Sequence, residues 1–189
     1  MQLLSRAITL AALALVVFGS PAAAQGIKFG PTFATFSSDA LDFKTRTGLH
    51  AGLFLGGSRD KTVGFQTEFN WLRKKAGTQS GQNIRIDYLQ LPTLLRVNGG
   101  SRSANGFGVY GIVGPAFSFK IGDEIEGFTL DDGFEGTDVS LVFGGGIEVV
   151  RIIVEGRYEK GFRRINNSFS VPSEIKTQAF TILFGLRFK

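Results

Sequence analysis

The feature that most constrains this chain is the alternation of side chains in its last stretch, residues 176–189. Successive side chains of a β-strand point to opposite faces. One face of this stretch is apolar and rich in aromatic rings, and its members are Phe180, Ile182, Phe184, Leu186 and Phe188. The opposite face carries Thr181, Gly185 and Arg187, with Leu183 as its apolar exception. A closing strand of this kind indicates a barrel whose outside contacts lipid.

The first 25 residues have the pattern of a cleavable signal peptide. Arg6 precedes an apolar run over 7–18, and an Ala-x-Ala pattern ends at Ala24. A run of about twelve apolar residues is too short for a transmembrane helix, which needs about 20. We therefore expect export, cleavage near Ala24, and one domain over residues 26–189. The chain has no cysteine, which excludes disulfides and thiolate metal sites.

The composition favours strands. The chain contains 26 Gly and 19 Phe, and no other apolar run reaches the length of a transmembrane helix. Small residues beside large rings are typical of barrels. The formal net charge is +5, and the basic residues are dispersed. Dispersed charge and export both argue against nucleic-acid binding.

Eight strand candidates are separated by polar or glycine-rich breaks. They span about 26–36, 44–56, 62–73, 83–97, 107–121, 138–150, 151–162 and 176–189. The segment 107–121 is the least regular, because both of its faces are fairly apolar. Eight is the smallest strand number of bacterial outer-membrane barrels. The predicted fold class is all-β, an eight-stranded antiparallel up-and-down transmembrane β-barrel in the bacterial outer membrane.

Two kinds of connection alternate along the chain. The shorter ones, 56–61, 98–106 and 149–151, are expected on the periplasmic side. The others, about 37–43, 74–82, 122–137 and 163–174, would face outward, as in outer-membrane barrels.

The charged face is predicted to line the lumen. Glycine recurs on it, as a crowded interior requires, at Gly30, Gly48, Gly52, Gly64, Gly144, Gly146 and Gly185. The apolar face carries more large side chains than a small interior could hold. The opposite arrangement, apolar inside and polar outside, would describe a soluble periplasmic barrel of the lipocalin kind.

Eight charged residues fall on the predicted lumen face. They are Lys28, Arg46, Glu68, Arg96, Glu148, Glu155, Arg157 and Arg187. An eight-stranded barrel is filled by its own side chains, and buried charges must be paired. We therefore expect a structural ion-pair network, with pore lining as the alternative. His50, the only histidine, shares this face. A hydrolase or acyltransferase would need it beside a serine and a carboxylate.

The longest outer loop, 122–137, is also the most acidic stretch. Its contact candidates are Asp123, Glu124, Glu126, Phe128, Asp131, Asp132 and Phe134. Carboxylates can hold calcium, but the spacing here is not an EF-hand, and a solvated loop is the favoured interpretation. Residues 106–111 match G-x-G-x-x-G, yet no helix can follow them at Pro115, which excludes dinucleotide binding.

Several ordered segments resemble a known family. They are Gly26-Ile-Lys-Phe-Gly30, Tyr88-Leu-Gln-Leu-Pro-Thr-Leu-Leu-Arg96, Gly144-Gly-Gly-Ile-Glu148, Val154-Glu-Gly-Arg-Tyr158 and Phe184-Gly-Leu-Arg-Phe188. Together they are similar to the PorT-like, eight-stranded outer-membrane barrels of Bacteroidetes and related bacteria. The resemblance implies an outer-membrane barrel. The namesake takes part in protein secretion, but the resemblance implies the barrel and not that role.

The expected function is structural or adhesive, without enzymatic activity, cofactor or metal. The expected partners are outer-membrane lipid and other envelope proteins, which would bind the outer loops, and the barrel is expected to be a monomer. Three alternatives remain open at this point: a narrow channel, a soluble ligand-binding barrel, and a membrane-embedded hydrolase or acyltransferase that uses His50.

Overall fold

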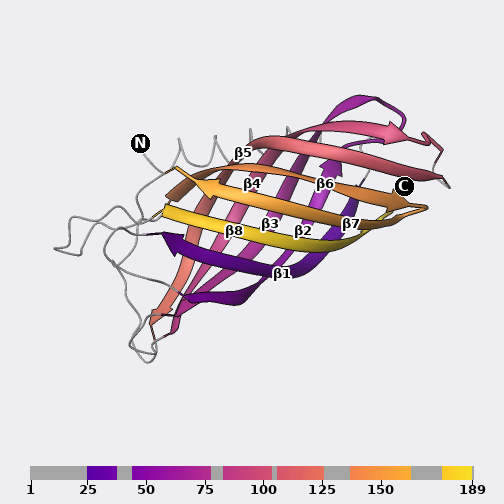
Figure 1. Ribbon diagram of the computed structural model, residues 1–189. Helices are drawn as coiled ribbons and strands as arrows, with labels where there is room; N and C mark the ends of the chain where they lie inside the picture. The colour runs from indigo at the N-terminus through magenta and orange to yellow at the C-terminus, as the bar shows by residue number, and fades with distance from the viewer. Residues whose placement is uncertain are drawn as a thin grey trace, which may run out of the picture.

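The computed structural model of the chain is a closed barrel of eight antiparallel strands (Figure 1). Each strand pairs with the next in sequence, and β8 pairs with β1 to close the sheet. The structure describes residues 25–37, 44–77, 83–103, 106–125, 137–162 and 176–188. Closure leaves no open sheet edge, so every strand has two partners for its backbone groups. The predicted fold class is confirmed.

The strands have the following bounds: β1 Gln25–Ser37, β2 Lys44–Gly56, β3 Val63–Gly77, β4 Asn83–Gly100, β5 Phe107–Ile125, β6 Thr137–Val149, β7 Ile152–Gly161 and β8 Lys176–Arg187. Three strands extend three or more residues beyond their predicted ends, and β4, which continues past residue 97 to Gly100, is one of them. β3 continues past residue 73 to Gly77, and β5 continues past residue 121 to Ile125. The start of the predicted outer loop 122–137 is therefore strand, because it pairs with the first residues of β4.

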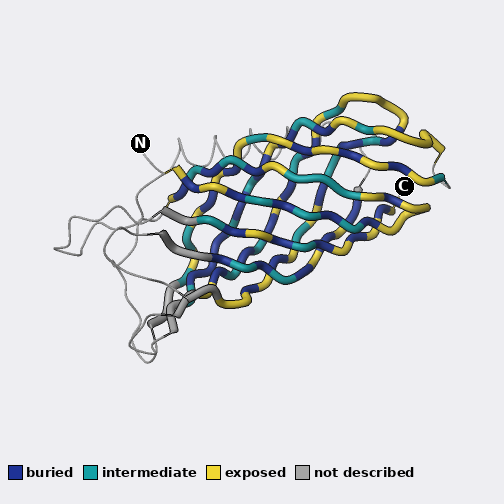
Figure 2. Tube along the Cα trace, viewed as in Figure 1, coloured by how far each residue is buried: buried dark blue, intermediate teal, exposed yellow. Residues whose placement is uncertain are grey.

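The predicted alternation between the two faces is visible along the barrel wall (Figure 2). The outward positions carry large apolar side chains that remain exposed on the isolated chain. They include Phe29, Leu53, Phe65, Phe69, Phe117, Phe143, Phe180 and Phe184. An apolar surface this extensive marks a lipid interface rather than a water interface. Among the described residues, no helix is long and apolar enough to cross a membrane.

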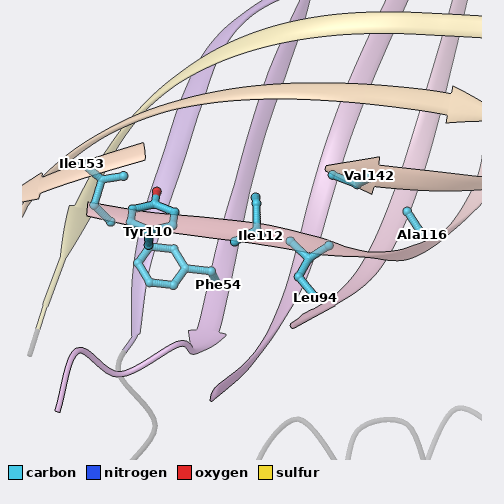
Figure 3. Packing of buried hydrophobic residues seen from close by; sticks show 7 residues of the cluster. All are labelled: Phe54, Leu94, Tyr110, Ile112, Ala116, Val142 and Ile153. Carbon is cyan, nitrogen blue, oxygen red and sulfur yellow. The ribbon is translucent and has the colours of Figure 1, made fainter. Parts of the chain in front are cut away.

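The inward positions include an apolar cluster as well as charges. Phe54, Leu94, Tyr110, Ile112, Ala116, Val142 and Ile153 pack together inside the barrel (Figure 3). Three of these residues come from β5, and over residues 107–122, where its side chains are described, this strand contributes no buried charge. This explains why both faces of β5 are apolar in the sequence: one faces lipid, and the other forms the apolar side of the lumen.

Glycine permits a close approach of strands at the β1–β8 seam. A Cβ on Gly30 would collide with the backbone carbonyl of Ile182, so only glycine fits without displacement. Gly64 behaves differently, because a Cβ there would meet nothing within 4 Å. The predicted crowding therefore holds at Gly30 against a neighbouring strand, and it is wrong for Gly64.

The β2–β3, β4–β5 and β6–β7 connections lie at one end of the barrel, which we call the turn end; the opposite end is the loop end. The β6–β7 connection is the two-residue turn Val150–Arg151, as tight as predicted. Val150 has a φ of 57°, a left-handed conformation rare for a β-branched residue. A two-residue hairpin needs such positive φ angles to match the twist of the strands.

Candidate functional site

The middle of the lumen is crossed by a four-residue ion-pair cluster, which we call the central cluster: Lys28, Glu68, Glu155 and Arg157. Lys28 comes from β1, Glu68 from β3, and the other two from β7. Each residue is at most 4% exposed. Two positive and two negative groups give the cluster a formal charge of zero.

The contacts of the central cluster span the barrel. The Lys28 Nζ lies 2.7 Å from the Glu155 carboxylate and 3.2 Å from that of Glu68. Arg157 donates two hydrogen bonds to Glu68, of 2.6 and 2.5 Å, and a third to Glu155. Paired hydrogen bonds from a guanidinium to a carboxylate are strong and directional. The cluster therefore ties β7 to β1 and β3 across the lumen.

Neighbouring amides complete the shell around Glu68. Gln66 Nε2 donates to this carboxylate at 2.6 Å, and Asn70 Nδ2 donates at 3.0 Å. Both residues are spaced by two from Glu68 on β3, so the strand period places all three side chains inside. A buried carboxylate is tolerated when charges and hydrogen bonds satisfy it in this way.

A second cluster, the turn-end cluster, surrounds Glu148 of β6. Arg96 Nη2 lies 2.7 Å from its carboxylate, and Arg187 donates at 2.6 and 3.1 Å. Arg59, from the β2–β3 turn, approaches to 3.9 Å. All four side chains are buried.

Two aromatic rings connect these clusters. The Phe54 ring has the Lys28 ammonium 4.9 Å from its centroid and the Arg187 guanidinium at 5.0 Å. The Arg96 guanidinium lies over the Tyr110 ring, 3.6 Å from its centroid. The Tyr110 hydroxyl donates a hydrogen bond of 2.5 Å to Glu155. Cations favour aromatic faces where water is excluded, so these rings fill the space between the charged groups.

A third group lies toward the loop end. Lys74 Nζ lies 2.8 Å from Glu159, which also accepts a hydrogen bond from Gln90 at 3.0 Å. Outside the lumen, Arg73 makes a paired contact with Asp87, at 2.8 and 3.0 Å, and lies over the Trp71 ring. Ion pairs thus fill the lumen at three depths, and outside it Asp87 also lies 3.6 Å from Arg85.

The structure brings together seven of the eight predicted lumen charges and not the eighth. Lys28, Glu68, Arg96, Glu148, Glu155, Arg157 and Arg187 are buried in the first two clusters. Arg46 is exposed, which corrects its predicted place in the lumen. The β2–β3 pairing shifts between Arg46 and Leu49, so that two residues of β2 lie opposite Lys74 alone. This bulge breaks the simple alternation of sides, and Lys74 occupies the lumen at that level.

Sequence reasoning missed several members of the network. Lys74 falls on the inner face if the alternation of β3 is continued beyond residue 73, where the prediction ended the strand. Glu159 follows Glu155 and Arg157 at the same spacing of two on β7, so it too could have been found. Arg59 gave no signal, because a turn has no period from which its direction can be predicted.

His50 lies inside the barrel, and its Nε2 has no hydrogen-bond partner among the described residues. No described serine is therefore joined to this nitrogen, as a nucleophile with its general base would be. Within the described ranges, no group of three His, Cys, Asp or Glu side chains could hold a metal ion.

The outer-loop contact candidates are divided by the structure. Asp123 and Glu124 are among the last residues of β5, where their backbones pair with β4. Glu126, Phe128, Asp131, Asp132 and Phe134 lie outside the described residues.

The comparison with family models is decisive for the class of protein. The model described as "Outer membrane protein beta-barrel domain" matches residues 21–167. The chain belongs to this family. Membership in an outer-membrane family, together with the apolar outer face and the charged lumen, overturns the soluble lipocalin-like alternative. A comparison with curated proteins gave no match.

One solved structure shows the same fold at low sequence identity, and two others match this chain slightly less well. The outer membrane protein OprG from Pseudomonas aeruginosa is 15% identical, with 88% of this chain and 96% of that chain covered and a TM-score of 0.51. Ail, the attachment invasion locus protein of Yersinia pestis, is 13% identical over 88% of this chain and 99% of that one, at a TM-score of 0.49. Neisserial surface protein A is 9% identical over 87% and 97%, also at 0.49.

Proposed function

We propose that this protein is a non-conducting outer-membrane barrel with a structural or interaction role, whose lumen is closed by its own ion pairs. The observation that carries the proposal is the central cluster, in which three strands contribute four charged groups that meet across the lumen. Water and ions would have to separate these pairs in order to pass.

The strength of the closure follows from the surroundings of the central cluster. The members of the apolar cluster on β4, β5 and β6 line one side of the lumen, and Phe54 and Tyr110 fill the space toward the turn end. Removing one member of a buried ion pair costs about 3–5 kcal/mol. An opening that breaks several such contacts at once would be rarely populated.

Single-channel recording in a planar lipid bilayer tests this proposal. The wild-type protein should give no conductance steps. The double variant Glu68→Ala/Arg157→Ala removes a paired contact from the lumen without changing net charge, and it should give small steps. The matched control, Arg73→Ala/Asp87→Ala, removes an equivalent pair from the outer face and should stay silent.

The same recording decides the alternative function, a narrow channel. Wild-type steps as large as those of the Glu68→Ala/Arg157→Ala variant would show that the cluster lines a pore and does not close it. The charged lumen favours this alternative over any catalytic role, because rings of charged side chains can line a path for ions.

The rest of the proposal concerns the cellular location of the protein and its partners. We infer that residues 1–25 are a signal peptide cleaved near Ala24, and that the ordered motifs place the chain among PorT-like barrels within its family. Outer-membrane lipid would cover the apolar face of a monomer. Envelope proteins would bind the loop end, where the acidic stretch 122–137 supplies carboxylates and aromatic rings.

A further inference from the structure

The turn-end cluster holds more positive than negative charge. The Glu148 carboxylate is shared by the guanidinium groups of Arg96 and Arg187, which are 1% and 4% exposed. Even with Arg59 set aside, two buried cations therefore face one anion. The central cluster, by contrast, is balanced at two against two.

Among the described residues, the other partners of these arginines do not correct the imbalance. Arg96 donates to the side-chain oxygens of Asn98 and Gln66, at 2.7 and 3.1 Å, and Arg187 donates to the Gly57 carbonyl at 3.2 Å. Amides and carbonyls satisfy hydrogen bonds but carry no net charge. Buried charge without a counter-charge is costly, so an anion beside this cluster would be stabilised.

A cavity of about 160 Å³ adjoins the cluster at the turn end. Arg96 and Glu148 line its inner side, and Lys61, Thr62 and Arg102, all exposed, line its rim. A cavity needs only about 10–15 Å³ to hold one water. This one therefore has room for an oxyanion of the size of phosphate together with waters.

The walls of the cavity are fixed by contacts between two turns. Asn98 Nδ2 donates to the Ser58 and Lys61 carbonyls at 3.0 and 2.9 Å, and Arg102 donates to Thr62 Oγ1 at 2.7 Å. Arg59 adds bonds to the carbonyls of Ser101 and Gly106, at 3.1 and 2.9 Å. The basic groups are thus held in place, which lowers the cost of ordering them around a ligand.

We propose that this cavity is a binding site for a phosphate oxyanion. Lys61 and Arg102 contact the anion at the rim, and the excess positive charge of Arg96 and Arg187 attracts it from below. Guanidinium groups suit phosphate because their N–H donors match its oxygens in pairs. The anion is either free phosphate or the phosphate of a phospholipid headgroup at the same membrane surface. The site is independent of whether the lumen conducts ions.

Calorimetric titration of the full-length protein tests the site. The protein is refolded in a non-ionic, phosphate-free detergent and titrated with inorganic phosphate or with glycerophosphoglycerol, a soluble headgroup diester. Binding in the millimolar range or tighter is expected for at least one of them. Binding of phosphate alone assigns a free ion, and binding of the diester assigns a lipid headgroup.

Two matched variants make the test specific. Lys61→Gln/Arg102→Gln removes two exposed positive charges from the rim and should weaken binding about tenfold or more. Arg46→Gln/Lys75→Gln removes two exposed charges near the loop end and should bind as the wild type does. Unboiled gel mobility verifies that each variant is folded. Absence of binding by both probes, or equal affinity in the wild type and the rim variant, would overturn the proposal.

Discussion

The substitution Glu68→Gln should destabilise the barrel strongly, because it removes one of two carboxylates from the central cluster. In the wild type, Lys28 lies 3.2 Å from the Glu68 carboxylate and Arg157 lies 2.5–2.6 Å from it. In the variant, both cations would have only the Glu155 carboxylate as a counter-charge. The side chain keeps its shape, so the change is one of charge. The surroundings are almost fully buried. The expected loss in the free energy of unfolding is about 3–5 kcal/mol, the cost of leaving a buried charge unpaired.

Equilibrium unfolding in urea measures this loss. The protein is reconstituted in phospholipid vesicles, and unfolding is followed by the fluorescence of Trp71, the only tryptophan. The midpoint should fall while the slope against urea stays constant, because the area exposed on unfolding does not change. Asp60→Asn, at an exposed carboxylate of the β2–β3 turn, is the matched control and should leave the midpoint unchanged.

A compensating variant separates charge balance from a general loss of packing. Lys28→Met combined with Glu68→Gln leaves Arg157 paired with Glu155 and restores neutrality. The double variant should therefore be more stable than Glu68→Gln alone, a non-additivity of about 1–3 kcal/mol. The reasoning is refuted if Glu68→Gln shifts the midpoint no more than Asp60→Asn does, or if the second substitution only adds to the damage.

Two further predictions concern the wall of the barrel. Gly30→Ala should prevent closure of the β1–β8 seam or lower the free energy of unfolding by about 1–3 kcal/mol, because its Cβ would overlap the Ile182 carbonyl. Gly64→Ala, where the Cβ would meet no atom within 4 Å, is the control, and equal unfolding midpoints in urea would contradict the crowding argument. Brominated lipid should quench the fluorescence of wild-type Trp71, which lies on the outward face of β3. If brominated lipid leaves the Trp71 fluorescence unchanged and aqueous iodide quenches it, the outward face of β3 is not in lipid.

The fold was predictable because the side-chain period of a strand is two and a barrel has only two faces. On β3, Glu68 and Phe69 illustrate this: adjacent in sequence, one is buried in the lumen and the other is exposed outside. The strand count and most strand bounds follow from the same period. The assignment of residues to the inner or outer face is wrong where a bulge interrupts the alternation, and Arg46 is exposed for that reason.

Partner choice inside the lumen could not be predicted. Alternation gives the face on which Glu68 and Glu148 lie, but not their depth or their direction across the barrel. Glu68 therefore could not be matched with Arg157, which is 89 residues away in sequence. The position of Arg59 depends on the path of a turn, for which the sequence offers no period. The pairing is set by tertiary geometry, and only the structure supplies it.

Closure of the lumen is the central claim, and the accessibility of a single introduced cysteine tests it most directly. The chain has no native cysteine. Leu183 of β8 pairs with Glu155 at the depth of the central cluster and is 0% exposed, whereas the adjacent Phe184 points outward. In vesicles, Leu183→Cys should resist a small water-soluble maleimide until the protein is unfolded. Phe184→Cys, the lipid-facing control, should react with a membrane-permeant maleimide. Rapid labelling of Leu183→Cys by the water-soluble reagent in the folded protein would contradict the account, because the lumen would then be open to water.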